Sequence, residues 1–154
     1  MRIRHATIED ADSIRAMLTE HFKAERECGS RVQVGEPTIR EAMALVGETL
    51  SQRYPGAVLI AEEGEEPIGL AALWCQESKG HDFARFAVPW VQYVRQASGA
   101  DGIAADLLQY VERVAMQLGC DAVRGSALLG TRAQMLYQSA GYAPAEVVFE
   151  KRLN

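Results

Sequence analysis

The sequence predicts a single α+β domain over residues 1–154, a mixed α/β sandwich whose central sheet is mostly antiparallel. A length of 154 residues fits one domain and is enough to bury a core. Hydrophobic residues make up 48% of the chain and charged residues 24%, as in ordinary globular proteins. Short apolar runs separated by glycine turns fill the middle of the chain, and helical periodicity lies on both sides of them. This pattern predicts about four helices around the sheet, in the order βααβββαβαβ.

The formal net charge of −5 argues against a nucleic-acid partner, because that role needs a surplus of Lys and Arg. The chain shows neither an apolar signal-peptide core nor a run of membrane-spanning length, so we expect no membrane partner. The cysteines are odd in number and widely spaced (Cys28, Cys75 and Cys120), which argues against a disulfide framework and favours the reducing cytoplasm. The three histidines are also far apart, and no metal site is predicted.

The chain is predicted to begin with a strand and a helix. Residues 2–6 alternate in polarity, as in a short strand. Thr7 followed three residues later by Asp10 has the spacing of a capping box, and apolar residues at helical spacing continue to about His21. Residues 22–37 show little periodicity and are predicted to form a long loop, with extra helical turns as the alternative.

A second capping box at Thr38 predicts a helix that runs to about Arg53. Apolar runs over 57–62 and 68–74, separated by a short acidic glycine turn, predict an antiparallel hairpin. A longer strand ends at Val94, and its internal Pro89 indicates an edge position, a bulge or a break. The rest is predicted to alternate: a helix from about Asp101 to Gly119, a strand over 121–128, a helix from about Thr131 to Ala140 and a strand over 147–153.

A loop of small residues joins the strand ending at Val94 to the next helix. The residues that keep side chains away from the backbone there are Gly99, Ala100, Gly102 and Ala104. Free N–H groups and the positive end of the helix dipole make such a turn a candidate anion site, most often for phosphate. The alternative is an ordinary turn in which Asp101 caps the helix. The glycine spacing differs from Gly-x-Gly-x-x-Gly, which disfavours a dinucleotide-binding Rossmann unit.

Two motifs in the second half of the chain resemble those of a known enzyme family. In the first, Val94 ends a strand, Gly102 and Ala104 follow at the start of a helix, and the apolar pair Leu107-Leu108 continues it. In the second, the segment from Ala133 to Tyr137 is followed, four residues after the tyrosine, by Gly141-Tyr142. With the order of the elements, these motifs make the whole chain similar to the Gcn5-related N-acetyltransferases (GNAT family). The resemblance implies the GNAT fold.

The resemblance also implies an activity. Acetyl-CoA would be the acyl donor, and a primary amine of a small molecule or peptide would attack it directly in a ternary complex. Tyr137 matches the tyrosine that acts in the family as general acid toward the CoA sulfur. In the family, the fourth strand is bulged and splays from the fifth, which leaves unpaired backbone groups for the acyl arm. The implied cofactor-binding residues are Gln92, Tyr93, Val94, Gly99, Ala100, Gly102, Ile103 and Ala104.

The pyrophosphate loop departs from the family pattern. Gly99 replaces the usual arginine or glutamine, Gln96 the usual turn proline and Gly130 the usual asparagine, while Asp101 adds a carboxylate. Arg95 and Arg132 are candidates to supply the missing charge. These departures favour an alternative from another class, a GNAT-fold protein that binds acyl-CoA or another ligand without turnover.

The sequence leaves the acceptor side open. Gln92 and Tyr93 occupy the positions nearest to the family's glutamate base, and the other candidates are Glu77, His81 and Asp82 on the preceding turn. Mixed charges in the loop after the first helix indicate a polar small molecule or a peptide end. Exposed apolar edges can pair two copies of this fold, so a homodimer is an option by analogy.

Overall fold

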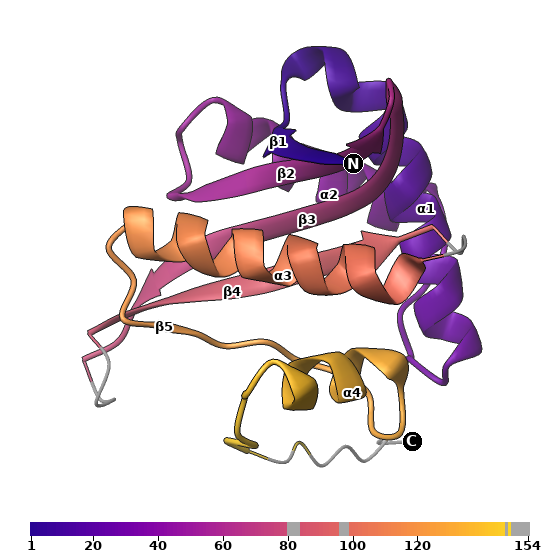
Figure 1. The fold of residues 1–154 in the computed structure, drawn as a ribbon. Coiled ribbons are helices and arrows are strands. Elements are labelled where there is room, and N and C mark those ends of the chain that lie inside the picture. The colour runs from indigo at the N-terminus through magenta and orange to yellow at the C-terminus, as the bar shows by residue number, and fades with distance from the viewer. Residues whose placement is uncertain (80–83, 96–98, 147, 149–154) are drawn as a thin grey trace, which may run out of the picture.

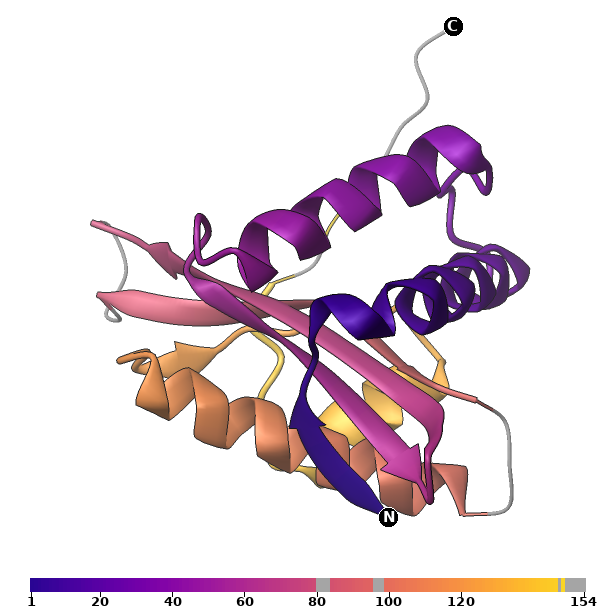
Figure 2. The same cartoon turned by 90° about the horizontal axis from the view of Figure 1, so that it is seen from above.

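The computed structural model describes residues 1–79, 84–95, 99–146 and 148. Within these ranges, α1 and α2 cover one face of a five-stranded sheet and α3 covers the other, with α4 on the α3 side (Figures 1 and 2). The elements, in chain order, are β1 Arg2–His5, a 3-10 turn Ile8–Asp10, α1 Ala11–Glu27, α2 Glu36–Leu50, β2 Gly56–Glu63, β3 Glu66–Glu77, β4 Arg85–Val94, α3 Ala100–Gln117, β5 Ala122–Val123 and α4 Arg132–Ser139.

The described strands follow one another across the sheet in chain order, and among them only β4 and β5 pair in parallel. The predicted α+β class and the order of the first nine elements are confirmed. The predicted strand over 147–153 lies outside the described residues, apart from Val148. Across the described ranges, every helix falls short of the length and apolar character that a membrane span needs.

Two helix boundaries differ from the prediction. Helix α1 does not end near His21 but continues to Glu27, because the residues up to Glu27 are good helix formers. The start of the 22–37 segment thus takes the alternative of extra helical turns, and the loop is shorter than predicted. The helix ends where Gly29 adopts a positive φ of 95° and the Ser30 N–H donates to the Glu25 carbonyl, a Schellman ending. Thr38 does not cap α2, because the helix begins earlier, after Gly35, and the Thr38 hydroxyl donates to a carbonyl of the preceding loop.

The central hairpin is confirmed. Strands β2 and β3 pair antiparallel, and the tight turn between Glu63 and Glu66 has Gly64 at a φ of +65°. Strand β4 pairs with β3, and its register shifts where Leu73 faces Pro89 and Ala72 faces Val91. Trp90 is therefore the extra residue of a β-bulge, which confirms one of the outcomes predicted from the proline.

Two apolar clusters, one on each face, hold the helices against the sheet. The cluster under α1 and α2 includes Ile14, Leu18 and Ile60, all fully buried. The cluster under α3 includes Leu73 and Leu107, also fully buried. Strand β3 contributes to both clusters because successive side chains of a strand point to opposite faces. The three central strands are thus fixed from both sides.

A buried ion cluster joins β1 to the start of α1. The Arg4 guanidinium donates two hydrogen bonds of 2.8 Å to the Asp10 carboxylate and one of 2.9 Å to Glu62. Asp10 also accepts the Thr7 backbone N–H at 2.7 Å, the side-chain bond expected of the predicted capping box. The Arg4 side chain is the largest of the causes that lower the pKa of Asp10 from 3.8 to about 2.

We expect Asp10→Asn to reduce the free energy of unfolding by about 2 kcal/mol at pH 7. Because the folded pKa is the lower one, the unfolded chain binds the extra proton, and the contribution of Asp10 is lost as the pH falls from about 4 to about 2. Urea unfolding across this range should show the variant and the wild type converging. The exposed Asp12→Asn is the control, and a pH-independent difference for Asp10→Asn would contradict the assignment.

Candidate functional site

Strand β4 has one edge without a strand partner over most of its length. Its pairing with β5 is limited to Phe86 with Ala122 and Ala87 with Val123. Two further backbone bonds of 2.8 Å flank this pairing, from the Asp121 N–H to the Arg85 carbonyl and from the Arg124 N–H to the Ala87 carbonyl, and the second ends the contact. From residue 88 to 94 no described strand pairs with β4 on the side away from β3. We call this stretch the free edge of β4.

Backbone groups of Gln92 and Val94 face the free edge. The Arg95 N–H donates to the Ile68 carbonyl of β3 at 2.9 Å. Since the backbone groups of successive strand residues point to alternate sides, those of Tyr93 also face β3, and those of Gln92 and Val94 face away from it. The free edge therefore offers N–H and C=O groups to a ligand that lies along it.

Helix α4 places Tyr137 beside this edge. The helix begins after Thr131, whose hydroxyl accepts the Gln134 N–H, and Figure 1 shows it beside the segment that follows β5. The Tyr137 ring lies directly against the backbone of Gly125, where an added Cβ would lie 2.5 Å from the Tyr137 hydroxyl oxygen. The ring also packs on Tyr142, with centroids 5.0 Å apart. Gly125 thus leaves the space that this ring fills.

The Gln92 side chain connects Tyr137 to α3. The Tyr137 hydroxyl donates to Gln92 Oε1 at 3.5 Å, and Gln92 Nε2 donates to the Ala104 carbonyl at 3.2 Å. The contact with the tyrosine is long for an O–H···O bond, so the hydroxyl is oriented but remains free to donate elsewhere. Burial raises the pKa of Tyr137 to about 12, which keeps its hydroxyl protonated at neutral pH.

The start of α3 presents backbone N–H groups at the place where the sequence predicts an anion site. Gly99 precedes the helix with a φ of +88°, which favours glycine, and the first helical bond runs from the Ile103 N–H to the Gly99 carbonyl at 3.1 Å. The N–H groups of the three residues between them have no acceptor within the helix. A Cβ added at Gly102 would meet no atom within 4 Å, so the backbone is open to an approaching group.

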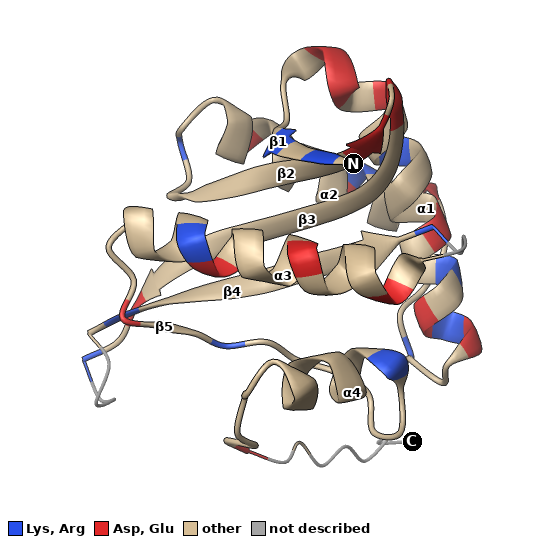
Figure 3. Ribbon diagram, viewed as in Figure 1, with Lys and Arg blue, Asp and Glu red and all other residues tan. Residues whose placement is uncertain are grey.

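Arg95 and Arg132, the candidates to supply charge at this helix start, are already paired. Asp101 accepts two bonds, of 2.8 and 2.9 Å, from Arg132 at the start of α4. Arg95 donates two bonds of 3.0 Å to Glu20 on α1 and one of 2.8 Å to the Pro67 carbonyl. Basic residues on α1 and α3 lie among acidic ones in the view of Figure 3. A ligand phosphate would therefore meet backbone N–H groups first and a guanidinium only if an ion pair opens.

Solved structures share this architecture over the whole chain. They include an aminoglycoside 6'-N-acetyltransferase from Acinetobacter haemolyticus at 18% identity, with a TM-score of 0.67 and 100% of both chains covered. An aminoglycoside N-acetyltransferase in complex with CoA has 19% identity and a TM-score of 0.72, with 99% of each chain covered. A protein from Bacillus halodurans has 20% identity and a TM-score of 0.81, again over 100% of both chains. The fold is that of the Gcn5-related N-acetyltransferases. Neither a family model nor a curated protein matches the sequence, and at these identities the likeness is one of fold.

In this GNAT fold, the predicted site residues other than Tyr93 lie in three places. Tyr137 lies on α4, Gln92 and Val94 lie at the free edge, and the residues from Gly99 to Ala104 form the start of α3. Tyr93 lies apart from them, because its backbone faces β3 and its ring packs on the α1 face against His21, with centroids 6.0 Å apart. Among the candidate bases, Glu77 lies at the far end of β3, whereas His81 and Asp82 lie outside the described residues.

Three features of the site were not predicted. They are the packing of Gly125 on Tyr137, the hydrogen bonds of the Gln92 side chain and the Asp101–Arg132 pair. A glycine within a predicted strand is a known sign of close approach by another group, so Gly125 could have been singled out. Nothing in the sequence indicates the other two, because they join residues that are 12 or more positions apart.

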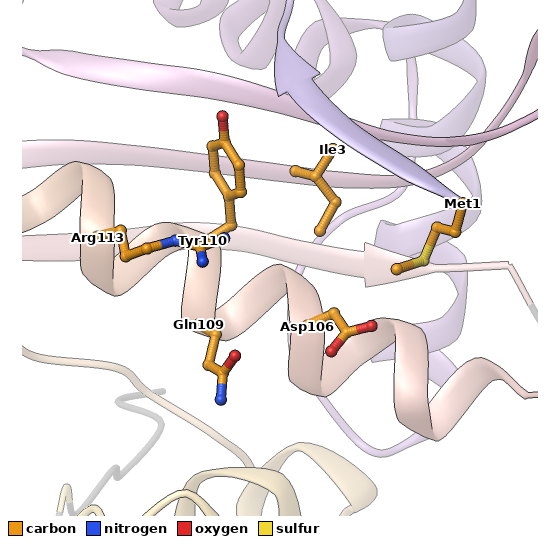
Figure 4. Close-up of a pocket in the computed structure, with 6 residues that line it drawn as sticks. All are labelled: Met1, Ile3, Asp106, Gln109, Tyr110 and Arg113. Atoms are coloured by element: carbon orange, nitrogen blue, oxygen red, sulfur yellow. The ribbon is translucent and has the colours of Figure 1, made fainter.

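A separate pocket lies between α3 and β1, on the opposite side of α3 from the free edge (Figure 4). It has a volume of about 280 Å³ and is lined by Met1, Ile3, Asp106, Gln109, Tyr110 and Arg113. It contains none of the predicted site residues. Among the described residues, no three His, Cys, Asp or Glu side chains are grouped as a metal site would need.

Proposed function

We propose that this protein is an N-acetyltransferase that transfers the acetyl group of acetyl-CoA to a primary amine of a small molecule or peptide, by direct attack in a ternary complex. One observation carries the proposal. A partly buried tyrosine hydroxyl, held by Gln92 and Gly125, lies beside a strand edge that offers unpaired backbone groups. The likeness to acetyltransferase structures supports the same reaction class.

The residues present fit the donor. The N–H groups at the start of α3 suit a pyrophosphate, and the open space at Gly102 lets it approach the backbone. The edge groups of Gln92 and Val94 suit the amides of the pantetheine arm, which binds as an added strand would. Bound acetyl-CoA supplies an activated acetyl group: a nitrogen–carbon bond forms as the carbon–sulfur bond breaks, and the proton lost by the amine balances the one gained by sulfur.

Tyr137 holds the proton that this reaction needs at its hydroxyl oxygen. Its raised pKa keeps the hydroxyl protonated at neutral pH, so it acts as a hydrogen-bond donor toward the developing thiolate. Gln92 orients the hydroxyl through a long contact that it can exchange for one with the ligand. The backbone N–H groups of the free edge can stabilise charge on the acyl oxygen without any movement of side chains.

A second candidate is a protein that binds acyl-CoA without turnover. The observation in its favour is the Asp101–Arg132 pair, which places a carboxylate in the first turn of α3 and occupies the guanidinium that could bind phosphate. Both candidates require binding of acyl-CoA, so acetyl-CoA binding is the first property to measure. Turnover then separates them.

We expect calorimetric titration to show micromolar binding of acetyl-CoA and about tenfold weaker binding by the variant Gly102→Ala, whose methyl group would occupy the approach to the backbone. The same substitution should stabilise the free protein by about 0.5–1 kcal/mol, because alanine is the better helix former.

Gly47→Ala is the matched control for this experiment. Gly47 lies in α2, and a Cβ there also meets no atom within 4 Å. It should raise stability by a similar amount and leave the affinity for acetyl-CoA unchanged. Absence of acetyl-CoA binding by the wild type would refute the proposed function. Equal affinities for the wild type and Gly102→Ala would refute the assignment of the phosphate site.

A further inference from the structure

Three aromatic rings form a row on the α1 and α2 face of the sheet. The Trp74 and Trp90 rings are stacked, with centroids 5.9 Å apart and planes 23° apart. Tyr54 continues the row, with its ring centroid 6.4 Å from that of Trp74. The two indoles are partly buried, and Tyr54 is 46% exposed. We call these three residues the aromatic row. It leads from solvent to β4.

The aromatic row ends at the bulge of β4. Trp90 is the extra residue of that bulge, and it packs on the same face as its neighbour Val91, under α1 and α2. After the bulge, Gln92 points to the opposite face, where it meets Tyr137. Different groups therefore lie on the two faces of the sheet near the bulge: the Tyr137 hydroxyl on one face and the two indole rings on the other.

One polar atom of the aromatic row has no partner in the described part of the chain. The Trp74 indole N–H is buried and meets no acceptor there. Most buried donors in folded proteins are satisfied, so an indole that served only as core would be expected to have one. A ligand or a water molecule that enters the aromatic row can supply this acceptor.

We propose that the aromatic row is the acceptor subsite and that the acceptor is a primary amine carrying an aromatic ring. The proposal rests on the proposed function, whose acceptor it specifies. The ring of the acceptor stacks against Trp90, since offset stacking with an indole is favourable and a planar ring matches the geometry of the existing stack. Its amine then reaches the bulge from the side opposite Tyr137. The amine nitrogen forms the bond to the acetyl carbon, and the thiol leaves on the Tyr137 side.

The chain contains two tryptophans, and both belong to the aromatic row, so indole fluorescence reports directly on the subsite. We expect 2-phenylethylamine to change the emission of the full chain in a saturable way. Its nonaromatic counterpart 2-cyclohexylethylamine should bind about tenfold more weakly, as the loss of one stacked pair implies. Equal affinity of the two amines, or no saturable change with either, would overturn the proposal.

Kinetics with acetyl-CoA provides a second test. The preference for 2-phenylethylamine over 2-cyclohexylethylamine in kcat/KM should fall about tenfold in Trp90→Leu and persist in Trp90→Phe, which keeps a ring. The affinity of Trp90→Leu for acetyl-CoA should stay unchanged, because Trp90 points away from the donor side. Tyr110→Leu, an aromatic deletion on α3, is the control and should keep the preference. A preference that survives in Trp90→Leu would overturn the proposal.

The two proposals fail in different ways. If the chain binds no acetyl-CoA, the proposed transfer reaction is refuted, while the fluorescence titration still measures whether aromatic amines bind to the aromatic row. If the chain acetylates aliphatic amines as well as aromatic ones, the transfer reaction stands and the aromatic subsite is refuted.

Discussion

Tyr137→Phe is expected to lower kcat by about 100-fold or more while leaving the affinity for acetyl-CoA within about twofold. The substitution removes only the hydroxyl oxygen. The ring still packs against Gly125 and Tyr142, so the position of α4 is kept. In the proposed reaction, what is lost is the hydroxyl beside the free edge that donates to the leaving sulfur. Steady-state kinetics combined with calorimetry separates this loss of turnover from a loss of binding.

Tyr142→Phe is the matched control, because it removes the neighbouring phenol oxygen. Burial and the nearby Glu112 carboxylate raise the pKa of Tyr142, so both phenols are protonated at neutral pH. We expect Tyr142→Phe to retain most of the wild-type kcat. Similar losses in the two variants would indicate an effect on packing. Full activity of Tyr137→Phe would refute the assignment of Tyr137 as the proton donor.

The pH dependence of the wild type provides a further check on Tyr137. Because burial raises its pKa to about 12, the hydroxyl remains protonated from pH 7 to pH 10. The kcat profile should therefore show no loss from ionisation of this tyrosine in that range. A loss with a midpoint near the ordinary tyrosine pKa of about 10 would mean that the ring is not buried in solution.

The fold was largely predictable because the strongest signals in the sequence are local. Alternation and glycine turns define the β2–β3 hairpin, and apolar spacing defines α3. Pro89 alone indicated a disturbed strand, and the structure contains a bulge there. The errors are at boundaries that depend on competing local bonds. The end of α1 depends on the cap at Gly29, and the length of β5 depends on its pairing with β4, which is limited to Phe86 and Ala87.

The site was predictable in its parts and not in its contacts. The family motif pointed to Tyr137 and to the start of α3, because both follow from spacing along the chain. The hydrogen bonds of Gln92 and the pairing of Arg132 with Asp101 join elements brought together by folding, so no local pattern encodes them. The same holds for the aromatic row, in which a turn, β3 and β4 each contribute one ring.

Gly125→Ala is expected to reduce kcat/KM by about 100-fold, because a misplacement of about 1 Å in a catalytic group has that effect. The new methyl group would overlap the Tyr137 ring, and the ring or α4 must move away. No residue of α4 is fully buried, so the helix can shift without disturbing either apolar cluster. The cost in stability should therefore be small, about 1 kcal/mol by urea unfolding.

A double-mutant cycle shows whether Gly125 acts through Tyr137. If the alanine only displaces the hydroxyl, Gly125→Ala should cost little more activity in a Tyr137→Phe background, where that hydroxyl is already absent. Additive losses in the cycle would mean that Gly125 affects the reaction by another route, such as contact with the donor itself. The non-additive result would connect a glycine of the β5–α4 segment to the chemistry through one ring. Gly125 would then be a positioning residue, required because any side chain there occupies the space of Tyr137.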